Sequence, residues 1–183
     1  GETTKTVKAV FDEEIAVPEA PVREGYEFAG WEPAVTIMDE EGKTFNATWT
    51  PATFIATYHI DSESYPYDVE FGDEMQSPAD PYKVGYNFLG WAEEEGSTTV
   101  VELPETMPGE NTEVKALWTK NAYSVKFVNG LTGAEITTVS GEFGAAVNAP
   151  ALPTEAGYTF AWDVTPPSTI PAKNEKGELM ANG

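Results

Sequence analysis

The sequence predicts a mostly β fold, arranged as an elongated tandem array of small modules with little or no helix. The first observation is repetition: the pattern Pro-x-x-x-Gly-Tyr-x-Phe-x-Gly-Trp occurs three times, at residues 21–31, 81–91 and, one residue shorter, 153–162. The second is spacing, because Phe11, Phe71 and Phe143 each precede the glycine of this pattern by 14 residues. The third is composition, since 14 Pro and 16 Gly interrupt the chain and leave no stretch with sustained helical apolar spacing. Copied units of this kind favour extension or multivalent display over a single catalytic pocket.

Short apolar or alternating runs mark the expected strands. They fall, in chain order, at residues 44–49, 54–60, 114–118, 123–128, 135–139 and 179–182. The first copy has no counterpart of the opening strand at 54–60, and the third copy stops just before the tryptophan that closes the other two. Copy one is therefore expected to begin late and copy three to end early.

Residues 123–128 give the clearest strand pattern. Tyr123, Val125 and Phe127 alternate with residues that point to the opposite face, as period-two spacing requires. Asn129-Gly130 follows and predicts a tight turn, after which 135–139 reads as the returning strand of a hairpin. The proline-rich stretches cannot be central strands, because proline lacks the ladder N–H, and we expect extended connectors at 17–21, 77–81 and 149–153.

The repeats divide the chain into three predicted modules: 1–50, which lacks its first strand, 51–119, which is complete, and 120–183, whose last strand is cut short. Each is near the lower size at which a core is self-sufficient, so contacts between neighbours are expected to matter. We expect a monomer. The alternative is a strand-exchange dimer, because the first module could accept its missing strand from another chain.

Composition excludes several classes of function. The net charge is −21 with only 10 Lys and Arg, so binding to nucleic acid is not expected. No apolar run approaches the ~20 residues of a transmembrane helix, and we expect no membrane insertion. The absence of cysteine removes disulfides and thiolate metal sites. Gly1 and the cut units indicate a fragment of a longer protein.

The residues do not supply the parts of a catalytic or cofactor site. His59 is the only histidine and reads as a lone surface side chain, and no Gly-x-Ser-x-Gly or phosphate-binding loop is present. Acidic runs at 12–14, 39–41 and 93–95 could offer oxygen ligands to calcium or an acid/base pair, but their spacing favours solvated loops. We expect no enzyme activity, no cofactor and no metal, although bound calcium and an intramolecular isopeptide bond stay open.

Aromatic residues supply the remaining candidates. Trp31, Trp91 and Trp162 recur at the same place in each copy, which favours a core role over a sugar-stacking one. A second set has no counterpart in the other copies and is therefore the better candidate for an exposed ligand patch: Tyr65, Tyr67 and Tyr82.

The repeated pattern, with a strand ending in tryptophan after it, resembles the Listeria-Bacteroides repeat family, which includes the B-repeat of internalins. The resemblance covers nearly the whole chain. It implies β-grasp-like (ubiquitin-like) modules in a secreted or wall-attached bacterial protein, where such repeats act as stalks or adhesive segments. We therefore expect an extracellular, non-catalytic stalk and adhesion module whose partner is a host or cell-wall protein, or a glycan. The alternative is a carbohydrate-binding module of a larger polysaccharide-degrading surface protein.

Overall fold

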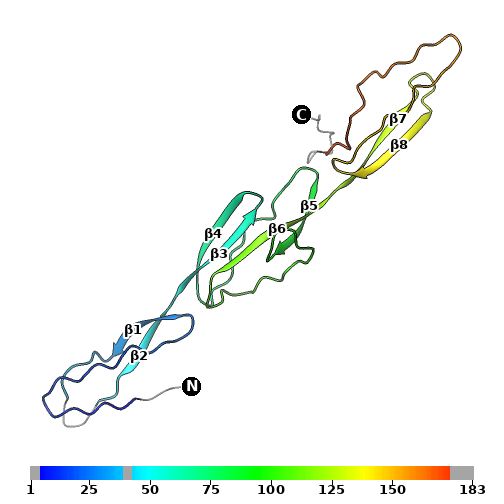
Figure 1. Cartoon of the computed structure of the whole chain (residues 1–183). Coiled ribbons are helices and arrows are strands. Elements are labelled where there is room, and N and C mark those ends of the chain that lie inside the picture. Colours follow the sequence, from blue (N-terminus) through cyan, green and yellow to red (C-terminus); the bar gives the residue numbers. More distant parts are fainter. Residues whose placement is uncertain (1–4, 39–42, 174–183) are drawn as a thin grey trace. The chain divides into compact units, whose positions relative to one another are not determined.

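The described residues of the computed structural model, 5–38 and 43–173, form β-strands and no helix (Figure 1). The strands are β1 (Tyr26–Glu32), β2 (Asn46–Pro51), β3 (Thr53–Ile60), β4 (Glu63–Glu70), β5 (Tyr86–Ala92), β6 (Thr112–Lys120), β7 (Ala122–Val128) and β8 (Glu135–Glu142). The expectation of a mostly β fold is confirmed. Within these residues no helix is long and apolar enough to cross a membrane.

The chain divides into two compact units. The first comprises 1–78 and 102–114, and the second comprises 79–101 and 115–183. Antiparallel pairing joins β1 to β2, β3 to β4, β5 to β6 and β7 to β8. The strand order β4-β3-β6-β5 makes one four-stranded sheet, and β6 passes from the first unit into the second. The three modules and their β-grasp topology stay predictions.

A β-bulge interrupts the strand formed by the repeated pattern. The register of β1 with β2 shifts between Phe28 and Gly30, and that of β5 with β6 shifts between Phe88 and Gly90. Both glycines have positive φ, +142° and +134°, a region that other residues rarely adopt. The third copy has Ala161 before its tryptophan and forms no strand there. Its expected partner strand, 179–182, lies outside the described residues.

The hairpin of β7 and β8 forms as predicted, but its turn does not. Asn129-Gly130 was expected to make a tight turn, and that expectation is wrong. The side-chain oxygen of Asn129 instead accepts hydrogen bonds from the N–H groups of Leu131 and Thr132, at 2.9 and 3.4 Å. This side-chain cap holds the chain in a longer loop, in which Gly133, at φ +72°, occupies the left-handed conformation.

The recurring tryptophans pack against the phenylalanines of their own copies. The Phe28–Trp31, Phe88–Trp91 and Phe127–Trp162 ring centroids lie 5.2 to 5.4 Å apart in edge-to-face geometry. Trp91 is buried, and the other two tryptophans are half-buried. The largest side chains that are almost fully buried elsewhere are Tyr58, Met107 and Ile170. The tryptophans therefore contribute to packing within each copy, as their recurrence indicated.

Candidate functional site

The most distinctive local structure is a joint at which a phenylalanine of one copy covers a glycine of the preceding copy. In the first joint, defined by Gly25, Tyr26, Ala52 and Phe71, the buried Gly25 has φ +76°. A Cβ added to it would lie 2.4 Å from the Phe71 ring, so only glycine fits beneath that ring. The Tyr26 and Phe71 rings meet edge-to-face at 5.2 Å.

A linker residue connects both sides of the first joint through its backbone. The Ala52 N–H donates to the Gly25 carbonyl at 2.9 Å, and the Ala52 carbonyl accepts from the Phe71 N–H at 2.8 Å. Ala52 follows β2 and directly precedes β3, so it lies where one copy ends and the next begins. The bonds fix the connecting backbone on both sides, and the aromatic contact closes over it.

The second joint repeats the first with different side chains. It consists of Gly85, Tyr86, Asn121 and Phe143, and all of it lies within the second compact unit. Asn121 N–H donates to Gly85 at 2.9 Å, and its carbonyl accepts from Phe143 N–H at 2.8 Å. The Cβ of a residue replacing Gly85 would lie 2.3 Å from the Phe143 ring, and the Tyr86 and Phe143 rings are 5.8 Å apart. The same device therefore occurs twice.

A basic side chain lies over the aromatic floor of each joint. The Arg23 guanidinium lies 3.9 Å from the Tyr26 ring centroid and 6.0 Å from that of Trp49. Lys83 occupies the same position in the second joint, 4.9 Å from the Tyr86 centroid and 5.4 Å from the Trp118 centroid. Each is a cation–π arrangement, which favours one position for a side chain that would otherwise be mobile.

The third copy has the same glycine and tyrosine, but in the part of the chain that the structure describes no phenylalanine covers this glycine. Gly157 has φ +84° and no atom within 4 Å of a Cβ built on it, and Tyr158 is 56% exposed. In the first copy the corresponding phenylalanine, Phe11, is 62% exposed. Gly157 and Phe11 thus show the same residues outside a closed joint, and they serve as comparisons for the two joints.

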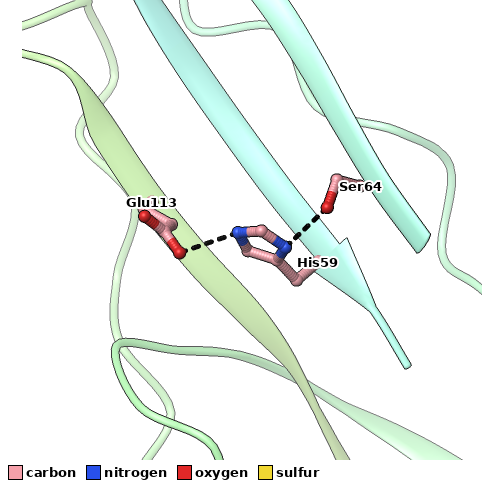
Figure 2. Close-up of polar contacts among 3 residues, drawn as sticks. All are labelled: His59, Ser64 and Glu113. Atoms are coloured by element: carbon pink, nitrogen blue, oxygen red, sulfur yellow. Dashed lines mark hydrogen bonds and ion pairs between the residues drawn. The ribbon is translucent and has the colours of Figure 1, made fainter. Parts of the chain in front are cut away.

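His59 is not the isolated surface side chain that the sequence indicated. Figure 2 shows its ring between Ser64 and Glu113: Nδ1 lies 2.8 Å from the Ser64 hydroxyl, and Nε2 lies 2.8 Å from Glu113 Oε1. His59 and Ser64 are directly opposed on β3 and β4, and Glu113 comes from β6. No sequence pattern marks this cluster, because Glu113 lies more than fifty residues after His59.

The Ser64–His59–Glu113 cluster contains the residue types of a hydrolase triad in the reverse arrangement. In such triads the serine bonds to Nε2 and the carboxylate to Nδ1, whereas here the serine is on Nδ1 and the carboxylate on Nε2. Ser64 is exposed on its strand. Two clefts, one beside Tyr82 and one beside Asp68, are lined by residues other than these three. The cluster links three strands, and its arrangement differs from that of such a triad.

Among the residues that the structure describes, two titratable groups have clearly shifted pKa values. Burial raises the pKa of Tyr58 above 10.0, and the nearby Tyr67 adds to the effect. The hydrogen bond from Thr138 lowers the pKa of Glu135 below 4.5, and Lys126, whose Nζ lies 3.1 Å from the Glu135 carboxylate, contributes further. The shift of Tyr58 thus follows from packing, and that of Glu135 from surface pairing. Over the described residues, no three metal-ligating side chains gather.

The three tyrosines proposed as a ligand patch lie in different units. Tyr65 and Tyr67 are two residues apart on β4 and therefore on the same face, in the first unit. Tyr65 is 41% exposed, whereas Tyr67 packs edge-to-face on Tyr58 at 5.8 Å. Tyr82 belongs to the second unit, is 56% exposed and lines a shallow cleft. Lys83 and Lys173 line the same cleft. Neither lysine was among the site residues predicted from the sequence.

Comparison with known proteins identifies the repeats and the boundary between two of them. A family model described as the Listeria-Bacteroides repeat domain matches residues 1–53 and 54–116. Internalin H of Listeria monocytogenes is 34% identical over 131 residues, which cover 66% of this chain and 24% of that protein. A protein of Evansella cellulosilytica named as a membrane protein is 28% identical over 172 residues, covering 87% of this chain and 26% of its own length.

A second protein of Evansella cellulosilytica, named as a Gly-rich membrane protein, is 27% identical over 173 residues, which cover 87% of this chain and 20% of that protein. The chain thus spans about a quarter or less of each of these relatives. The two matched copies cover more than half of the chain, and the boundary between them falls beside Ala52 of the first joint. The chain therefore belongs to the Listeria-Bacteroides repeat family.

Proposed function

We propose that this chain is a non-catalytic repeat segment of a bacterial cell-surface or secreted protein, where it serves as a stalk and as an adhesion or protein-interaction module. The observation that carries the proposal is the joint that occurs twice with the same hydrogen bonds and the same ring over glycine. A device that restrains one copy against the next has a use in a spacer and none in catalysis. The likeness to internalin H and to proteins named as membrane proteins supports a place in the cell envelope.

The mechanism is mechanical and multivalent. Each joint restricts the backbone between successive copies, so a repeat array holds its outer segments away from the cell and presents weak sites many times. Repetition raises the effective concentration of such sites, which lets weak contacts add up to firm attachment. The partner is a host or cell-wall protein, or a glycan. The acidic surface, with a net charge of −21, opposes nucleic acid as a partner.

The test measures whether the first joint restrains its two sides. The chain has no cysteine, so spin labels can be attached only at Glu27→Cys and Asp68→Cys, two exposed positions on β1 and β4 of the first unit. Electron–electron double resonance should give one narrow distance distribution. Phe71→Ala should broaden it by removing the ring from Gly25.

The matched control is Phe11→Ala, which removes the equivalent ring where it covers no glycine. Phe11 is exposed, so this change should leave the distance distribution narrow. A distribution that is already broad in the unaltered chain, or one that Phe71→Ala leaves unchanged, would contradict the stalk proposal. Adhesion is tested separately with beads coated with the chain, which should bind to purified cell walls or host-cell surfaces more than uncoated beads do.

A further inference from the structure

Two complementary halves of a joint are exposed in this chain. Phe11 holds the place of the two joint phenylalanines by spacing, and 62% of it is exposed, whereas both of those rings are half-buried. Gly157 is exposed, although the corresponding glycines of both joints are buried, and Tyr158 beside it is 56% exposed. One half thus presents a ring without a glycine beneath it, and the other presents a glycine and a tyrosine to solvent.

The loop that presents Phe11 has the hydrogen bonds of the loops that present the joint phenylalanines. Asp12 N–H donates to the Met38 carbonyl at 3.0 Å, and Met38 N–H donates to the Glu13 carbonyl at 3.0 Å. Glu13 N–H donates in turn to the Val10 carbonyl at 3.1 Å, and the same three bonds recur in both joints at 2.7 to 3.1 Å. Asp12 has φ +64°, which non-glycine residues seldom adopt, where the joints have glycine at +83° and +80°. The ring is therefore presented as in a closed joint.

The glycine half also has the conformation of a closed joint. Gly157 has φ +84°, beside +76° and +80° for the two joint glycines. Tyr158 N–H donates to the Glu155 carbonyl at 3.1 Å, and the tyrosines of both joints donate in the same way, at 3.1 and 3.0 Å. A ring that binds to this half meets a surface that is already ordered, so it loses less conformational entropy than on a flexible one.

We propose that two molecules of this chain associate head to tail, with Phe11 of one molecule packed on Gly157 and Tyr158 of the other. The structure shows the occupant of such a glycine twice, because a phenylalanine covers it in each joint and meets the neighbouring tyrosine edge-to-face. A contact between unlike halves leaves one half of each molecule free, so it can continue to a third molecule. Where many molecules share a surface, repetition makes such weak contacts effective.

The contact between two molecules is expected to be weak. In each closed joint a linker residue bonds to both sides through its backbone, and two separate molecules do not share a linker. The net charge of −21 on each chain also opposes association. For one buried ring we expect a Kd on the order of 1 mM. Salt should lower this Kd, because it screens the repulsion between the chains.

Mixing two variants in an NMR titration tests the proposal. Phe11→Ala removes the ring and keeps the glycine half. Gly157→Ala keeps the ring half and adds a Cβ at the place where, in the closed joints, it would lie 2.3 to 2.4 Å from the ring. Isotope-labelled Phe11→Ala is titrated with unlabelled Gly157→Ala up to about 2 mM, which exceeds the expected Kd. Saturable shifts are expected at the amides of Gly157 and Tyr158, and none at the Phe71 amide of the first joint.

Matched variants serve as controls. The double variant Phe11→Ala, Gly157→Ala has neither half, so as the unlabelled partner it should cause no shift. Gly133→Ala matches the backbone strain, since Gly133 lies in the same unit at φ +72° with nothing described within 4 Å of its Cβ. Translational diffusion should show that Gly133→Ala still self-associates, whereas Phe11→Ala and Gly157→Ala each weaken self-association at least tenfold. If Gly157→Ala disturbs folding, the unaltered chain replaces it as the ring donor.

Four results would overturn the proposal. They are no saturable shift at Gly157 and Tyr158, equal shifts with the double variant, equal loss of association in Gly133→Ala and Gly157→Ala, and association of Phe11→Ala with itself through β2, which would show strand exchange instead. The stalk proposal is tested by a distance within one molecule, so the failure of either proposal can be recognised separately.

Discussion

Replacing Gly25 by alanine is expected to open the first joint. The new Cβ would lie 2.4 Å from Cγ and Cδ2 of Phe71, which is closer than non-bonded carbons approach one another. Cγ lies on the Cβ–Cγ axis, so turning the ring about that bond cannot relieve the contact, and the whole side chain has to move. The ring must leave its position, and the edge-to-face contact with Tyr26 is lost with it.

The free-energy cost of Gly25→Ala has two parts. Alanine at φ +76° costs about 1–2 kcal/mol in backbone conformation, whatever surrounds it. Displacing Phe71 costs a further amount, which we set at about 2 kcal/mol because the ring is half-buried and complete removal of a buried phenylalanine costs about 3–5 kcal/mol. That second part corresponds to about a 30-fold change in an opening equilibrium.

Amide hydrogen exchange measured by NMR separates the two parts. The Ala52 and Phe71 N–H groups form the hydrogen bonds of the first joint, so their exchange rates report its opening. The control is Gly72→Ala, since Gly72 lies in the same unit at φ +83° with nothing within 4 Å of its Cβ. Gly25→Ala should raise the two rates about 30-fold more than Gly72→Ala does. Equal rates in the two variants would refute the claim that the ring contact holds the joint.

Four further predictions concern titration and the histidine cluster. Tyr58, with its pKa raised above 10.0 by burial, contributes stability that is present below pH 10 and lost as pH rises through its folded pKa; circular dichroism should show alkaline unfolding that Tyr58→Phe shifts to higher pH. Glu135, with its pKa lowered by Thr138, contributes stability above its unfolded pKa that is lost as pH falls through the folded value; Thr138→Val should raise the pKa of Glu135 in an NMR titration. Ser64→Ala should hydrolyse p-nitrophenyl acetate at the same low rate as the unaltered chain. His59→Ala should lower the free energy of unfolding, measured in urea, by about 1 kcal/mol or less, because the cluster is partly exposed.

The sequence predicted the strands better than the contacts between them. Alternation over 123–128 located β7, and the runs that end in tryptophan at 44–49 and 114–118 located β2 and β6, because these signals depend on residues close in the chain. The repeated pattern itself was not predicted as a strand, although it forms β1 and β5. The hairpin loop escaped prediction since the Asn129 side chain competes for backbone amides, a choice that composition does not reveal. The equal spacing of Phe71 and Phe143 was visible, but not that each covers a glycine of the copy before it.

The candidate site was predictable only in part. Tyr82 stood out because it has no counterpart in the other copies, and the structure places it on a cleft. Lys173 could not be connected to it, since the two are brought together by the second joint and not by any local motif. Glu113 was hidden for the same reason, because its pairing with His59 depends on which strands are neighbours in the sheet.

The joints can close only in the order in which the copies are synthesised. Gly25 and Tyr26 are made long before Phe71, so during synthesis the first joint stays open until the next copy has emerged. At about 5–20 residues per second this delay is about 2–9 s. Each copy is thus finished by its successor, and the growing end always presents an uncovered glycine and tyrosine. A ribosome that pauses between copies would leave that aromatic surface open for as long as the pause lasts.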